Sequence, residues 1–198
     1  MSKSNRNGQS ECLSLSQVET FLSNLPIKYS LLAEVMYFSA GRVRECTTIK
    51  VRNINFKTQL LTLEKSSTKT KESRQVPLHP STLEKLQAWI TSNNLESDDF
   101  IFFTSSRNTN YKIGEKPVSI QSVDGFFRKT FDWIGIQGAS THSFRRSRLT
   151  HLMEKSWNMR EIMDISGHKS LISLQKYLNT DKADTFEKYK RLFDKELV

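Results

Sequence analysis

The chain has 198 residues, enough for one domain with a sizeable core or for two small domains. Its net charge of +9 favours a polyanionic partner, most simply nucleic acid, although a basic soluble protein of another kind fits the charge alone. The longest apolar run, Leu31 to Phe38, is short and interrupted by Glu34, which excludes a membrane span and predicts a core helix. Cys12 and Cys46 form no C-x-x-C pair and are expected to be reduced thiols of an intracellular protein, and no secretory signal is visible.

The first third of the chain predicts helices. Residues 1–12 are rich in Ser, Asn and Lys, so we expect them to be disordered. Ser16 and Glu19 have the spacing of a capping box, which predicts a helix that begins there and ends before Pro26. A second helix is predicted from about Lys28 to Ala40, where a glycine stops it.

The middle of the chain changes to strand patterns. Residues 51–78 predict strands joined by a polar hairpin loop at 66–72, and Pro77 predicts that the returning strand lies at a sheet edge. An amphipathic helix follows after His79, which we interpret as structural. Residues 104–118 predict a polar, DNA-facing loop, and residues 119–136 predict a helix with much aromatic bulk.

The stretch from Thr141 to Tyr177 concentrates groups that suit a phosphodiester. Thr141 is predicted to cap a helix, and His142 and Arg145 are three residues apart, so they share a face of it. His168 follows a glycine at a helix break, and Tyr177 lies nine residues later near the end of the next predicted helix. Arginine binds phosphate oxygens, histidine transfers a proton, and a tyrosine hydroxyl can attack phosphorus.

The pattern H-x-x-R, then G-H, then Tyr nine residues later resembles the tyrosine recombinases of the phage integrase family. Upstream, S-A-G-R-V-R-E resembles the family's T-G-L-R-I-S-E, which places Arg42 on its first catalytic arginine and Glu45 on its acidic residue. Aligning V-P-L without gaps puts Lys69 on the family's hairpin lysine, with Lys71 as the alternative. The resemblance therefore implies six catalytic residues: Arg42, Lys69, His142, Arg145, His168 and Tyr177.

The sequence also departs from the family pattern. Ser166 precedes Gly-His where a leucine is usual, Leu174 stands where threonine is common, and the lysine loop lacks its usual glycines. His151 matches no catalytic position and is interpreted as structural. Family members also carry an N-terminal helical domain that clamps the other face of DNA. Its absence here indicates either a truncated chain or a minimal recombinase.

The resemblance implies an α+β, mainly helical fold: a helical bundle with a small antiparallel sheet on one edge. We expect a catalytic domain at residues 13–181 and a tail helix at 182–198 that links subunits. The implied partner is double-stranded DNA, bound by a protein that is a monomer in solution and a homo-tetramer on DNA, with accessory DNA-bending proteins. The location would be the cytoplasm of a bacterium, on bacterial, phage or plasmid DNA.

The implied activity is site-specific recombination, in which DNA is cleaved and rejoined through a 3′-phosphotyrosyl intermediate. Cationic side chains would replace metal ions, so no metal and no cofactor are expected. Two alternatives remain open: a DNA-binding regulator of the same family with limited catalysis, and a type IB topoisomerase-like enzyme that relaxes DNA. A metal-dependent nuclease fits worst, because the sequence has no carboxylate cluster.

Overall fold

The computed structural model describes residues 9–64, 72–104, 111–177 and 190. The predictions for Lys69, Lys71 and the tail helix at 182–198 therefore fall outside the described residues, except for Lys190.

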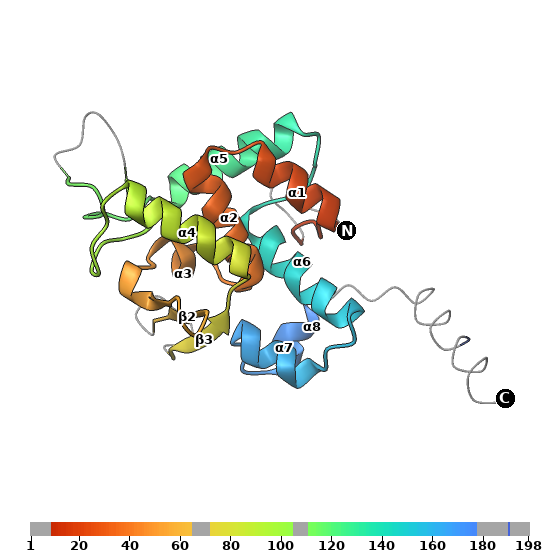
Figure 1. Ribbon diagram of the computed structural model, residues 1–198. Helices are drawn as coiled ribbons and strands as arrows, with labels where there is room; N and C mark the ends of the chain where they lie inside the picture. The colour runs from red at the N-terminus through yellow and green to blue at the C-terminus, as the bar shows by residue number, and fades with distance from the viewer. Residues whose placement is uncertain (1–8, 65–71, 105–110, 178–189, 191–198) are drawn as a thin grey trace.

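Helices dominate the fold, and a small sheet lies at one edge (Figure 1). In chain order the elements are α1 (Leu15–Ser23), α2 (Ile27–Phe38), α3 (Val43–Thr47), a 3₁₀ turn (Val51–Asn53), β1 (Ile54–Asn55), β2 (Leu60–Leu63), β3 (Arg74–Pro77), α4 (Pro80–Ser92), α5 (Ile120–Trp133), α6 (Thr141–Glu154), α7 (Met159–Ser166) and α8 (Leu171–Gln175). The three strands pair antiparallel in the order β1-β2-β3, with Leu61 opposite Val76. This arrangement confirms the predicted fold class and the edge position of Pro77.

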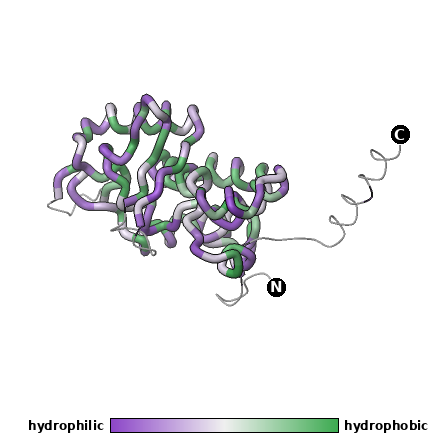
Figure 2. The backbone as a smooth tube through the Cα atoms, turned by 90° about the horizontal axis from the view of Figure 1, so that it is seen from below, coloured by the Kyte–Doolittle hydropathy of each residue, from purple (hydrophilic) through white to green (hydrophobic). Residues whose placement is uncertain are grey.

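Helix α2 forms the centre of the bundle. It packs against α1, α3, α4 and α6, and its residues from Leu31 to Tyr37 are all buried. A helix that is buried around most of its circumference must be covered on several sides, which explains why four helices surround it. Hydrophilic and hydrophobic stretches alternate along the backbone tube, as expected where elements place one face on a core (Figure 2).

An aromatic cluster fixes α6 to the bundle. The ring of Phe144 on α6 lies 5.1 Å from Phe21 of α1 and 5.4 Å from Phe127 of α5, centroid to centroid. Each of these rings is almost fully buried. Buried aromatic pairs at such distances add about 0.5–1.5 kcal/mol beyond the area they bury, so they hold α6 in one position. That position matters because α6 carries Arg145.

Three local predictions were wrong. Helix α1 is capped by Ser14 with Gln17 rather than by Ser16 with Glu19, because buried Leu13, whose amide donates to Ser147, fixes the chain immediately before Ser14. Helix α6 is capped by Ser140, whose hydroxyl accepts from the His142 amide, so Thr141 is the first helical residue. Helix α8 ends at Gln175, two residues before Tyr177.

The expectation of disorder over residues 1–12 also fails for the part that the structure describes. The side-chain oxygen of Gln9 accepts a 2.6 Å hydrogen bond from Arg146, and the amide of Glu11 donates to the carbonyl of Gly138. Leu13 is fully buried next to this segment, and its amide donates to the Ser147 hydroxyl. A polar segment can therefore be ordered when α6 and the residues just before it supply hydrogen-bond partners.

Candidate active site

Arg145 lies at the centre of the candidate site. Its side chain is almost completely buried, with 1% exposed. Nη1 donates to the carbonyl of Ala40, 2.5 Å away, and Nη2 donates to the carbonyl of Ser166, 2.8 Å away. The guanidinium is thus tied to the chain just after α2 and to the end of α7. Among the residues that the structure describes, its buried Nε has no hydrogen-bond partner.

Glu45 on α3 neutralises part of the positive charge around this centre. One oxygen of its buried carboxylate accepts from Arg42 at 2.8 Å, and the other accepts from Arg74 of β3 at 2.8 Å. Burial alone would raise the pKa of Glu45, but the hydrogen bond and charge of Arg74, together with Arg42, lower it below the usual value. Glu45 therefore remains ionised and holds two arginines from different elements in place.

Arg74 was not among the predicted site residues. Its Nε also donates to the carbonyl of Ile165 in α7, 3.2 Å away, so it joins the sheet to the element that precedes His168. A signal for it exists in the sequence. The strand period of two puts Arg74 on the same inward face as buried Val76, and a half-buried arginine requires a carboxylate partner. Glu45 is that partner.

The turn from α7 to α8 positions His168. Gly167 adopts a left-handed conformation, with φ of 69°, and ends α7; its amide donates to the carbonyl of Met163 at 2.7 Å. His168 follows with its ring buried, and its Nδ1 lies 2.7 Å from the hydroxyl oxygen of Ser166. Arg145 Nη2 lies 3.4 Å from Nδ1 and 3.2 Å from Nε2.

Tyr177 completes the cluster. The centroid of its ring is 5.0 Å from the centroid of the His168 ring. The guanidinium carbon of Arg145 is 5.5 Å from the same Tyr177 centroid. The ring is half-buried and packs on a small hydrophobic cluster that includes Leu149 and Leu174. Its amide donates to the carbonyl of Leu174, so the last turn after α8 sets the position of the residue.

The electrostatics of the cluster favour an anionic ligand. Burial, and then the charges of Arg42 and Arg74, lower the pKa of Arg145 to about 10, so it stays charged near pH 7. Burial, and then the charges of Arg145, Arg42 and Arg74, lower the pKa of His168 to about 3. His168 is therefore a neutral imidazole near pH 7. Within the described part of the chain no group of three or more His, Cys, Asp or Glu side chains could hold a metal ion.

The structure brings together four of the six predicted residues: Arg42, Arg145, His168 and Tyr177. His142 is exposed in the first turn of α6, one turn before Arg145. Lys69 lies outside the described residues, between β2 and β3. Helix α7 contacts β3, the strand that follows these residues in the chain.

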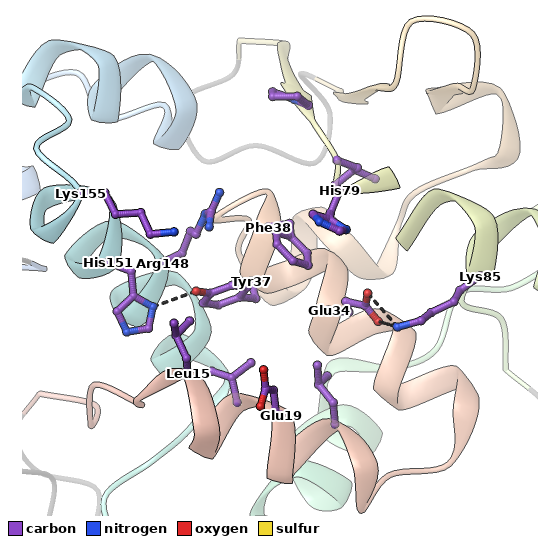
Figure 3. A pocket seen from close by; sticks show the side chains of 14 residues that line it. Leu15, Glu19, Glu34, Tyr37, Phe38, His79, Lys85, Arg148, His151 and Lys155 are labelled. Atoms are coloured by element: carbon purple, nitrogen blue, oxygen red, sulfur yellow. Dashed lines mark hydrogen bonds and ion pairs between the residues drawn. The ribbon is translucent and has the colours of Figure 1, made fainter. Parts of the chain in front are cut away.

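A cavity of about 580 Å³ lies between α1, α2, α4 and α6, away from these residues (Figure 3). His151 lines it, and its Nδ1 is 2.8 Å from the hydroxyl of Tyr37. His79 also lines it, stacks on Phe38 with centroids 5.2 Å apart, and accepts from the Ser81 amide as the cap of α4. These contacts agree with the interpretation of both histidines as structural.

Comparison with known proteins identifies the class. The model of the phage integrase family matches residues 11–184, and the chain belongs to that family. It is 30% identical over 164 residues to the tyrosine recombinase XerC of Proteus mirabilis, covering 79% of this chain and 49% of XerC. It is 27% identical over 151 residues to the tyrosine recombinase XerA of Pyrococcus furiosus, covering 76% of this chain and 50% of XerA. The chain thus spans about half the length of these relatives.

Solved structures agree on the fold. A crystal structure of XerA recombinase superimposes with a TM-score of 0.76 at 17% identity, covering 93% of this chain and 66% of that one. A XerH site-specific recombinase, bound to a palindromic difH substrate in a post-cleavage complex, superimposes with a TM-score of 0.71 at 18% identity, covering 94% of this chain and 54% of that one.

None of the helices in the described part of the chain has the length and hydrophobicity of a membrane span.

Proposed function

We propose that this chain is the catalytic part of a site-specific recombinase that cleaves and rejoins double-stranded DNA through a 3′-phosphotyrosyl intermediate. The observation that carries the proposal is the convergence of Arg145, His168 and Tyr177 from three segments of the chain. The centroid of the Tyr177 ring lies 5.0 Å from the centroid of the His168 ring and 5.5 Å from the guanidinium carbon of Arg145. Family membership and the net charge of +9 support DNA as the substrate.

In the proposed reaction the Tyr177 hydroxyl oxygen attacks phosphorus and the bond to the 5′-oxygen breaks. A phenol is a weak acid, so attack needs a base, and His142 takes or relays the phenolic proton. Lys69 gives a proton to the departing 5′-oxygen, a form of help that is typically worth about 10²–10⁴-fold. Rejoining reverses these steps. The phosphotyrosine conserves the bond energy, so no nucleotide is consumed.

The buried cations carry the transition-state stabilisation. Each η nitrogen of Arg145 donates one of its two N–H groups to a main-chain carbonyl, which fixes the plane of the guanidinium. The other N–H groups, including that of buried Nε, remain as donors for an oxygen of the phosphate. Arg42, held by Glu45, supplies a second guanidinium from α3. Neutral His168 adds a hydrogen bond rather than a charge. A phosphorane with two charged oxygens matches this set of donors.

The same proposal covers assembly and location. A homo-tetramer on DNA, formed from protomers that are monomers in solution, fits strand exchange between two duplexes, and the tail at 182–198 would link the subunits. The enzyme would act in the cytoplasm on bacterial, phage or plasmid DNA, with accessory DNA-bending proteins.

The test is covalent capture from a library of nicked suicide duplexes with randomised sequence around the nick. Loss of the short fragment beyond the nick traps the enzyme on DNA, and the adduct survives SDS. We expect a covalent adduct with the native chain and none with Tyr177→Phe, which keeps the ring for packing and loses only the nucleophile. DNA binding of the two proteins should be nearly equal in a gel shift. An adduct of undiminished yield with Tyr177→Phe, or none with the native chain, would refute the proposal.

A further inference from the structure

Ser166 occupies an unusual position in the site, because it touches two of its key groups at once. It is the last residue of α7 and is fully buried. Its main-chain carbonyl accepts from Arg145, and its side-chain hydroxyl lies 2.7 Å from Nδ1 of His168. A leucine, usual at this place in the family pattern noted above, could make the first contact but not the second.

The hydroxyl has two acceptors within reach, and they differ in distance. Nδ1 of His168 lies at 2.7 Å, whereas the carbonyl of Met163 lies at 3.4 Å. Hydrogen bonds from hydroxyl groups are strong near 2.7–2.8 Å and weak beyond about 3.0 Å. The hydroxyl proton therefore points to Nδ1, and a neutral imidazole that accepts at Nδ1 must carry its own proton on Nε2. His168 is neutral near pH 7, so only one of its nitrogens is protonated.

The contact of Arg145 with the ring does not oppose this assignment. Its Nη2 is almost equally far from Nδ1 and Nε2, at 3.4 and 3.2 Å. An atom at this range from both nitrogens lies over the face of the ring, off the in-plane lone-pair direction of either nitrogen. Its strong bond is the 2.8 Å one to the Ser166 carbonyl. Nothing in this geometry requires a lone pair on Nε2.

We propose that Ser166 is a positioning residue that donates its hydroxyl proton to Nδ1 of His168 and thereby holds the ring in the Nε2–H tautomer, ready to donate to an oxygen of the scissile phosphate. The inference rests on the proposed function for its purpose, but the tautomer itself is a property of the free protein. A ring with a lone pair on Nε2 would repel the phosphate oxygen and would have to change tautomer first. Ser166 removes that step.

The direct test is the tautomer of His168 in the free protein, read from the ¹⁵N chemical shifts of its ring at pH 7. The chain has four histidines, so His168→Gln assigns the signals. We expect the native protein to show the Nε2–H form, Ser166→Thr to retain it, and Ser166→Ala and Ser166→Leu to give a mixture of tautomers. Ser147→Ala is the matched control, because it also removes a fully buried hydroxyl on the side of α6 that faces Leu13.

The second readout is the rate of suicide cleavage. Loss of one neutral hydrogen bond should slow cleavage by roughly 3- to 10-fold in Ser166→Ala, with unchanged DNA affinity and with recovery in Ser166→Thr. A native ring in the Nδ1–H form, or the native tautomer retained in both Ser166→Ala and Ser166→Leu, would overturn the inference. If the tautomer changes as expected but the native protein gives no covalent adduct, the proposed function fails and the positioning by Ser166 stands.

Discussion

Replacing Glu45 should cost more stability than replacing any exposed acidic residue. The carboxylate is 1% exposed and receives three hydrogen bonds: from Arg42 Nη1 at 2.8 Å, from the Arg42 amide at 2.9 Å and from Arg74 Nη2 at 2.8 Å. Hydrogen bonds to charged groups contribute about 1.5–3 kcal/mol each, and the cost of burying the charge offsets part of that sum. Removing one partner of a buried ion pair costs about 3–5 kcal/mol, because the remaining charge loses its partner.

We therefore expect Glu45→Ala to lower the free energy of unfolding by about 3–5 kcal/mol. Glu72→Ala is the control: Glu72 also pairs with a cation, Lys169 at 2.7 Å, but both side chains are more than half exposed. An exposed pair contributes at most about 1 kcal/mol. Urea denaturation at pH 7, monitored by circular dichroism, measures the free energy of unfolding of both variants. Equal losses in the two variants would refute the argument that burial makes the Glu45 contacts strong.

The pH dependence provides an independent check on the same group. Folding lowers the pKa of Glu45 below its ordinary value of 4.5, so its contribution to stability is fully present above about pH 4.5 and is lost as pH falls through the folded-state value. The difference in unfolding free energy between the native protein and Glu45→Gln should be constant from pH 7 to about pH 5 and should shrink at lower pH. A difference that grows on acidification would contradict the assigned sign.

Three further outcomes are expected. Suicide cleavage should be unchanged by EDTA, since side chains supply the positive charge; loss of activity that magnesium restores would instead indicate a metal-dependent nuclease. Affinity for DNA should fall steeply with salt, with a slope of about −0.9 per phosphate contact on logarithmic axes, so a flat titration would argue against backbone binding. Gly41→Ala should destabilise the fold by about 1–3 kcal/mol in urea denaturation, because its Cβ would lie 2.5 Å from Cys46 Sγ and 2.8 Å from Ser39 Oγ; native stability would show that this corner can relax.

The sequence predicted the helices well because they depend on short-range patterns. A dense apolar run marks α2, apolar periodicity marks α5, and the spacing from His142 to Arg145 and from His168 to Tyr177 predicts the candidate site. Helix ends were harder to predict. Ser14 and Ser16 are both good caps, and the burial of Leu13 against α6 in the folded bundle favours Ser14. Competition of this kind is settled by tertiary packing, which a local pattern does not contain.

The contacts between segments distant in sequence could not be predicted from periodicity. Glu45 and Arg74 are 29 residues apart, and Arg145 meets the carbonyl of Ala40 across 105 residues. The sequence indicates that each charged group needs a partner, but which partner it meets depends on how β3, α3 and α7 pack. The role of Ser166 is similar. The sequence shows it only as a departure from a pattern, and its meaning comes from the position of the His168 ring.

The hydrophobic core is divided, and the division separates the parts of the site. The main cluster holds α1 to α5, the first turns of α6 and the sheet, whereas a smaller one joins Ala40 and the far end of α6 to α7 and α8 through Leu149, Leu152, Ile162 and Leu174. Arg42 and Glu45 belong to the first part, and His168 and Tyr177 to the second. Sub-global opening of the smaller unit would withdraw the proposed nucleophile from Arg42 and Glu45. In the proposed reaction, strand cleavage would then depend on the local folding equilibrium of α7 and α8, and a partner that stabilises these two helices would raise the population of competent enzyme without contacting DNA.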